Sequence, residues 1–150
     1  MSNFTHLKIE KDYKILKNQI LKTPLIFSEY INNLTNAEIF FKLENLQWTG
    51  SFKLRGAMNK INKLTLEEKK RGVVAYSSGN HAQAVAYASK INQIQATIVM
   101  PKNAPKIKIN NTKKYGAKIV LYDPKKESRE IIGNQISYEQ GKILIKPYDD

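Results

Sequence analysis

The chain has 150 residues and no cysteine, which suits a domain of ordinary size and excludes disulfide bonds, thiolate zinc sites and a cysteine nucleophile. Hydrophobic residues make up 41% and charged residues 25% of the sequence, so its composition is that of a globular protein rather than a disordered one. The net charge is +12, and the segment 102–118 holds six lysines and no acidic residue. The chain has 22 lysines but only three arginines. Proteins that bind nucleic-acid phosphates usually use arginine, whose guanidinium group forms two parallel hydrogen bonds, so we do not expect nucleic acid as the main partner.

The amino-terminal residues show no cationic start followed by an apolar stretch, so we expect no secretory signal. No apolar run approaches the roughly 18 residues that a membrane span needs. The sequence therefore predicts a cytoplasmic protein with no membrane contact.

Helices and short apolar strands alternate along the chain. In chain order, the expected elements are a helix over 5–21, a strand over 39–43, a turn over 47–51, a helix over 53–64, a capping box at 65–68, a strand over 73–76, a helix over 81–90, a strand over 96–100, a helix from 105 to 116, a strand over 118–122, a helix over 127–140 and a strand over 143–145. Such alternation predicts an α/β fold, with a parallel sheet of βα units and helices on both faces. The charged stretch 69–72 separates this regular part from a first portion that we do not expect to close a core alone.

The segment 49–57 places Lys53 at the start of a helix after a glycine-containing turn. The amino end of a helix carries partial positive charge, so a desolvated amine there becomes a usable nucleophile for carbonyl groups. Phe52 is positioned to supply an apolar wall. The local pattern alone also fits a solvated helix lysine.

The segment 77–84 places small residues and Asn80 between a strand and a helix. This arrangement directs free backbone N–H groups at an anion such as a carboxylate or phosphate, although an ordinary helix cap at Ser78 or Asn80 fits equally well. His81 is more typical of a structural hydrogen-bonding residue than of a catalyst. No nucleotide-binding fingerprint and no metal-ligand spacing is present.

Together, these two segments resemble the fold type II pyridoxal-phosphate enzymes of the threonine dehydratase and serine racemase family. Further short motifs follow in family order along nearly the whole chain, at residues 23–25, 41–44, 99–101, 104–105, 115–117 and 147–149. The resemblance implies the fold of the tryptophan synthase beta subunit.

The resemblance also implies residue roles. Lys53 would form the internal aldimine with pyridoxal 5'-phosphate and then act as acid and base at the substrate α-carbon. Phe52 would pack beside the cofactor ring, and Asn80 would hydrogen-bond its phenolic oxygen. The substrate carboxylate would be held, mainly through backbone N–H groups, by Ser77, Ser78, Gly79, Asn80 and His81.

The reaction implied by the resemblance is β-elimination of water from threonine or serine, giving a 2-oxo acid and ammonia. Ser78 occurs in members that resemble serine racemase or the hydroxyaspartate dehydratases, where its hydroxyl would serve as a second acid/base on the face opposite Lys53. Racemisation and dehydration of threo-3-hydroxyaspartate are therefore the alternatives. Racemase-type members often use a divalent cation, whose ligands we expect beyond Asp150.

Enzymes of this family are about twice as long as this chain. We therefore expect an amino-terminal portion, in which 1–70 begins the large cofactor domain and 71–150 forms the small domain. The glycine-rich phosphate cradle would follow Asp150, so we expect the 150 residues alone to be inactive and the full-length enzyme to be a homodimer. A non-catalytic truncated remnant, or a basic binding module using 102–118, are the other readings.

Overall fold

The computed structural model describes residues 5–150; residues 1–4, on which the argument against a secretory signal partly rests, lie outside the described part. The chain divides into two compact units, Met1–Phe52 and Lys53–Asp150. The sequence placed a boundary near residue 70, whereas the second unit begins earlier because helix α3 (Lys53–Asn62) packs against helix α5 (Asn80–Ile91). The assignment of 1–70 and 71–150 to the large and small domains of the family stays a prediction.

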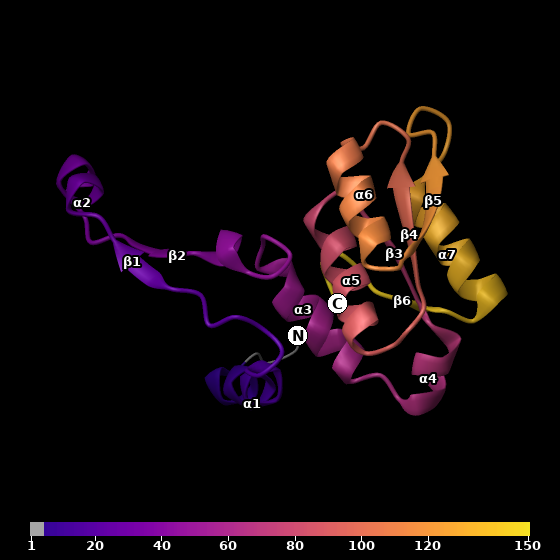
Figure 1. The fold of residues 1–150 in the computed structure, drawn as a ribbon, viewed down its shortest axis with the longest axis horizontal. Helices are drawn as coiled ribbons and strands as arrows, with labels where there is room; N and C mark the ends of the chain where they lie inside the picture. Colours follow the sequence, from indigo (N-terminus) through magenta and orange to yellow (C-terminus); the bar gives the residue numbers. More distant parts are fainter. Residues whose placement is uncertain (1–4) are drawn as a thin grey trace. The chain divides into compact units, whose positions relative to one another are not determined.

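The first unit contains helix α1 (His6–Leu16), an antiparallel pair of strands β1 (Leu25–Phe27) and β2 (Phe40–Lys42), helix α2 (Glu29–Thr35) between them, and the short 3-10 helix η1 (Glu44–Leu46). Figure 1 shows α2 at the tip of the β1–β2 pair. The side chains of both strands are exposed, and α2 contains no buried residue. The expectation that the portion before residues 69–72 closes no core of its own stays a prediction.

Two features of the first unit differ from the sequence prediction. Strand β1 and helix α2 were not expected, although Ser28 accepts a hydrogen bond from Ile31 N as an N-cap and Asn36 ends the helix in the left-handed conformation. Helix α1 ends at Leu16 rather than at residue 21. Beyond the helix, the amide side chain of Gln47 bonds both the N–H and the carbonyl of Leu21, which holds this residue in a non-helical segment.

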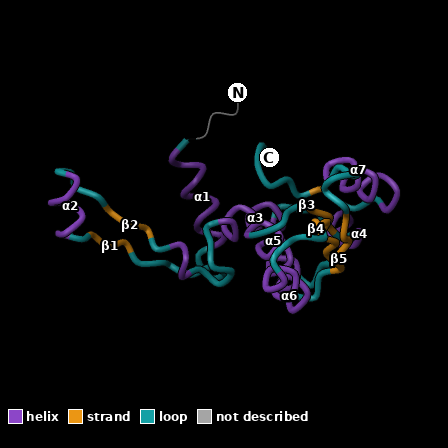
Figure 2. Tube along the Cα trace, turned by 90° about the horizontal axis from the view of Figure 1, so that it is seen from above, coloured by secondary structure: helices purple, strands orange, loops and turns teal. Residues whose placement is uncertain are grey.

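The second unit is built on a parallel sheet in the order β5-β4-β3-β6. Its strands are β3 (Val73–Tyr76), β4 (Ala96–Pro101), β5 (Lys118–Tyr122) and β6 (Ile143–Leu144). Helix α7 (Arg129–Gln140) covers one face, and α5 with α6 (Lys106–Lys114) covers the other (Figures 1 and 2). The predicted α/β class and parallel sheet with helices on both faces are confirmed.

The core of the second unit lies between the sheet and its helices. Strand β3 is buried along its whole length, and the largest fully buried side chains of α3 are Leu54, Met58 and Ile61. Between α3 and β3, helix α4 (Leu66–Arg71) begins with the predicted capping box, in which Thr65 and Glu68 bond each other's backbone N–H. No helix in residues 5–150 has the length and apolar character needed to cross a membrane.

Candidate functional site

Lys53 is the first residue of α3 and is half-buried. Its Nζ donates a hydrogen bond to the carbonyl oxygen of Pro147 at 2.5 Å. The helix dipole at this end opposes positive charge, which is the electrostatic setting predicted for the amine. The sequence correctly placed this lysine at a helix start after a turn.

The turn that precedes Lys53 is organised by a buried amide. The Gln47 side chain accepts from the N–H groups of Leu21 and Trp48 and donates to the carbonyl of Leu21. Gly50 adopts a φ of +70°, a conformation that favours glycine. In the described chain, the hydroxyls of Thr49 and Ser51 on either side of it are buried and have no hydrogen-bond partner.

The loop between β3 and α5 leaves the start of α5 open to an anion. Ser77 N bonds Val99 O in the sheet, and Ser77 Oγ accepts from Gly79 N at 3.3 Å. Gly79 is the N-cap of α5 and makes no side-chain cap bond. The first N–H groups of a helix have no intrahelical acceptor, so this end keeps donors for a carboxylate or phosphate. The alternative of a side-chain cap from Ser78 or Asn80 is not what the structure shows.

His81 is buried at the start of α5, and its Nε2 lies 3.0 Å from the carbonyl oxygen of Ile145. A carbonyl only accepts, so Nε2 carries the proton. Burial lowers the pKa of His81; the Ile145 hydrogen bond opposes this shift, while the charge of Lys53 adds to it. His81 is therefore held neutral, and its hydrogen bond to Ile145 holds the segment that follows β6.

The segment 145–147 connects the two predicted motifs. Ile145 N bonds Val74 O and so extends the pairing of β6 with β3. The Ile145 carbonyl accepts a hydrogen bond from His81, and two residues later the Pro147 carbonyl accepts one from Lys53. The lysine and the start of α5, far apart in the sequence, thus reach one segment beside the carboxyl end of β3. Ligands of open α/β sheets bind beyond the carboxyl ends of the strands.

The remaining predicted site residues lie as follows. Ser78 is exposed in the loop and Asn80 is exposed as the first residue of α5, where its Oδ1 accepts a hydrogen bond from Lys108 Nζ at 2.9 Å. Phe52, the last residue of the first unit, has 60% of its surface exposed. The role of Phe52 beside a ring and that of Ser78 at a second face stay predictions.

Sequence reasoning missed three contributors to this region: Lys108 on α6 and the backbone carbonyls of Ile145 and Pro147. Carbonyls carry no sequence signal. Lys108 is one of 22 lysines and was read only as part of a basic segment. Its position three residues after Pro105, in the first turn of a predicted helix, was the one available signal.

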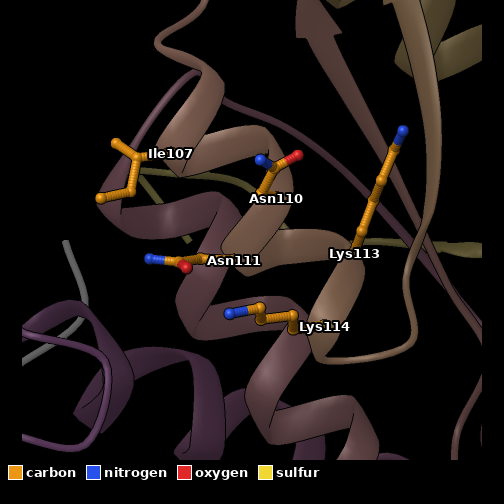
Figure 3. A pocket seen from close by; sticks show the side chains of 5 residues that line it. All are labelled: Ile107, Asn110, Asn111, Lys113 and Lys114. Atoms are coloured by element: carbon orange, nitrogen blue, oxygen red, sulfur yellow. The ribbon is translucent and has the colours of Figure 1, made fainter.

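A surface pocket of about 570 Å³ lies along α6, and none of the predicted site residues lines it. It is lined by Ile107, Asn110, Asn111, Lys113 and Lys114, which Figure 3 shows. All five residues belong to the basic segment 102–118. The pocket holds none of the groups predicted to act in chemistry.

Comparison with known proteins identifies the relatives. Residues 16–150 match the family model described as pyridoxal-phosphate dependent enzyme. The chain is 48% identical over 134 residues to the L-threo-3-hydroxyaspartate ammonia-lyase of Saccharomyces cerevisiae, covering 89% of this chain and 41% of that protein. It is 47% identical over 143 residues to the catabolic L-threonine dehydratase of Staphylococcus aureus, covering 95% of this chain and 41% of that protein.

The fold has the same relatives. The crystal structure of serine racemase from Dictyostelium discoideum matches with a TM-score of 0.88 and 42% identity, covering 96% of this chain and 47% of that one. The chain spans about 41% of the length of the curated relatives it matches. The resemblance inferred from the ordered motifs is confirmed: the chain belongs to the family of pyridoxal-phosphate-dependent enzymes.

Proposed function

We propose that the protein is a pyridoxal-phosphate-dependent ammonia-lyase that converts a hydroxy amino acid, threonine or serine, to a 2-oxo acid and ammonia. The proposal rests on one observation. The Lys53 amine and the His81 ring, which lies at the start of α5, both hydrogen-bond carbonyl oxygens of the segment 145–147. The relatives named as threonine dehydratase and hydroxyaspartate ammonia-lyase support it.

The donor set fits the cofactor and an amino acid. A half-buried primary amine at a helix start suits the cofactor aldehyde, and the uncapped start of α5 suits a carboxylate. The Asn80 amide is exposed beside that helix start, where it suits a ring oxygen. When bound, pyridoxal phosphate supplies an electron sink for the negative charge that develops at the substrate α-carbon.

The residues of this chain then have distinct tasks. The backbone N–H groups at the start of α5, over 77–81, hold the substrate carboxylate and so fix the orientation of the α-carbon. Lys53 would attach the cofactor through its amine and afterwards take the α-proton. Overall, the substrate would lose its α-proton and β-hydroxyl as one water and take up one water, which gives the 2-oxo acid and ammonia. His81, neutral and tied to Ile145, keeps the segment 145–147 beside these groups.

Racemisation, as in serine racemase, is the second candidate. The Ser78 hydroxyl is exposed in the carboxylate loop, where it is free to return a proton to the opposite face of the α-carbon. The solved serine racemase structure supports this reading by its 42% identity. Replacement of Ser78 by Ala should abolish racemisation of serine while ammonia release continues.

The homodimer and a divalent cation are expectations from the resemblance alone. The cytoplasmic location is the expectation from the amino-terminal residues and the short apolar runs of the sequence. Gel filtration with light scattering of the complete gene product tests the dimer, and a monomer would contradict it.

The decisive experiment compares Lys53→Ala with the complete product of the gene that encodes this chain. The unaltered protein should show the visible absorption of bound pyridoxal phosphate and release ammonia from threonine or serine, and Lys53→Ala should lose both. Lys90→Ala is the matched control, because Lys90 is an exposed lysine at the far end of α5. Turnover that survives in Lys53→Ala would overturn the proposal. The 150 residues alone should release no ammonia.

A further inference from the structure

Two pairs of side chains connect α5 and α6. Lys108 Nζ donates to Asn80 Oδ1 at 2.9 Å, and Asn111 Nδ2 donates to Gln83 Oε1 at 3.2 Å. Asn80 and Gln83 are three residues apart on α5, and Lys108 and Asn111 are three apart on α6. Residues at this spacing lie on one face of a helix, so the pairs form two successive rungs between the helices.

Both pairs have the same hydrogen-bond direction: a side-chain nitrogen on α6 donates and a side-chain amide oxygen on α5 accepts. A lysine ammonium can only donate, so the Asn80 amide must turn its oxygen toward Lys108. The Nδ2 amine of Asn80 is then directed away from Lys108 as an available donor. An acceptor at position 108 would favour the opposite orientation of the amide.

Gln83 shows the consequence of the same orientation in a buried setting. Only 4% of its surface is exposed, and within residues 5–150 its Nε2 has no hydrogen-bond partner. A buried donor without an acceptor is costly to leave unpaired. The first turn of α5 thus presents amide donors for which the described chain supplies no acceptor.

Lys108 is not engaged elsewhere. It is half-buried, and in the described part of the chain it forms no ion pair with a carboxylate. The segment 102–118 contains no acidic residue that could compete for it. The Asn80 oxygen is therefore the acceptor that fixes its ammonium group.

We infer that Lys108 is a positioning residue for the cofactor site: its donor-only ammonium sets the Asn80 amide so that the NH2 group, not the oxygen, faces the phenolic oxygen of bound pyridoxal phosphate. This inference rests on the proposed function and on the role predicted for Asn80. A donor to that oxygen stabilises its anionic form, whereas a reversed amide would set two acceptors against each other. Lys108 acts on the cofactor through Asn80 and does not touch it.

The test uses the complete gene product. Titration with pyridoxal phosphate measures cofactor affinity, and a pH titration of the loaded protein measures the midpoint, which is the pH at which the visible absorption band of the bound cofactor is half changed. Lys108→Met removes the donor and should weaken affinity about 3- to 10-fold, as expected for loss of one well-placed hydrogen bond, and move the midpoint to higher pH. Lys108→Glu offers only acceptors and should be worse than Lys108→Met. Lys108→Arg keeps a donor-only cation and should stay within about 3-fold of the unaltered protein.

Two further comparisons separate positioning from a general effect on the fold. In an Asn80→Ala background, Lys108→Met should cause no additional loss, because the two residues act in series. Lys106→Met, which removes an exposed lysine in the same turn of α6, should leave affinity and midpoint unchanged. Equal losses from Lys108→Met with and without Asn80, or no loss at all, would overturn the inference. Failure of the unaltered protein to bind the cofactor would instead overturn the proposed function, and the inference with it.

Discussion

Two glycines inside helices differ in what surrounds them. At Gly133 in α7, an added Cβ would lie 2.7 Å from Cδ1 of the buried Tyr76 ring, whereas nothing lies within 4 Å of the position at Gly56 in α3. Tyr76 belongs to a core cluster and is further held by Arg129, 5.7 Å above its ring, so it cannot move away easily. The glycine that weakens α7 as a helix is therefore needed for packing.

Replacing Gly133 by Ala should lower the free energy of unfolding by about 1 to 2 kcal/mol, because overpacking outweighs the gain in helix propensity. Gly56→Ala, the matched control, should raise it by about 0.5 to 1 kcal/mol. Urea unfolding of the two variants measures both values. Stabilisation of similar size in both variants would contradict the packing argument.

His81 gives stability a specific dependence on pH. Its pKa is lowered from the ordinary value of 6.5 in the folded chain, chiefly by burial. As the pH falls below that value, the unfolded chain takes up a proton at this position before the folded chain does, so stability decreases until the folded group also titrates. A neutral side chain at this position removes that contribution.

The unaltered chain should therefore lose its advantage over His81→Gln as the pH falls. Between about pH 7.5 and pH 5.5, the difference in unfolding free energy should shrink by up to about 1 kcal/mol. Urea unfolding at both pH values measures it, and carboxylates common to both proteins cancel in the comparison. A difference that stays constant or grows in acid would show that His81 is not held neutral by the fold.

At the scale of elements, two helices begin with threonine but only one is capped by it. Thr65 Oγ1 accepts a hydrogen bond from Glu68 N at the start of α4, and the Glu68 carboxylate accepts one from Thr65 N. These bonds lower the pKa of Glu68, so its contribution is present at neutral pH and is lost as the pH falls through that lowered pKa. Thr5 is the N-cap of α1 and makes no side-chain cap bond.

Thr65→Ala should therefore destabilise the chain by about 1 kcal/mol at neutral pH, while Thr5→Ala should change it little. The cost at Thr65 should be smaller at an acidity where Glu68 is protonated, because half of the capping box is already lost. Chemical unfolding at both acidities gives the values. Equal costs at the two threonines would mean that the cap contributes nothing to α4.

At the scale of the whole molecule, the compact unit Lys53–Asp150 includes α3, whose side chains Leu54, Met58 and Ile61 are fully buried. Helix α3 makes its main packing contact with α5. A chain that begins at residue 71 would remove this apolar partner and expose that face of α5 to water.

Residues 53–150 produced alone should unfold cooperatively, whereas residues 71–150 should be much less stable or only partly folded. Thermal and urea unfolding followed by circular dichroism compare the two chains directly. If residues 71–150 were as stable as residues 53–150, the boundary near residue 70 expected from the sequence would be the better physical division.

The sequence by itself determined the regular part of the fold. Strands over 73–76 and 118–122 have the bounds that were predicted, because each is a short apolar run beginning just after a glycine turn. The capping box at 65–68 was also read correctly, since a cap depends on residues only three apart. The ordered motifs, too, sufficed to name the family. Local backbone preferences and short-range hydrogen bonds depend on residues that are close together in the sequence.

Only the tertiary structure decided which groups meet. Lys53 and Pro147 are 94 residues apart, and Asn80 and Lys108 are 28 apart. The local sequence does not show that Lys108 bonds Asn80, that Gln47 bonds Leu21 or that Gly133 makes room for Tyr76. These contacts depend on strand order and helix packing, because the order β5-β4-β3-β6 brings the segment after β6 alongside the end of β3. Side-chain partners that are distant in the chain become neighbours only once the sheet is assembled.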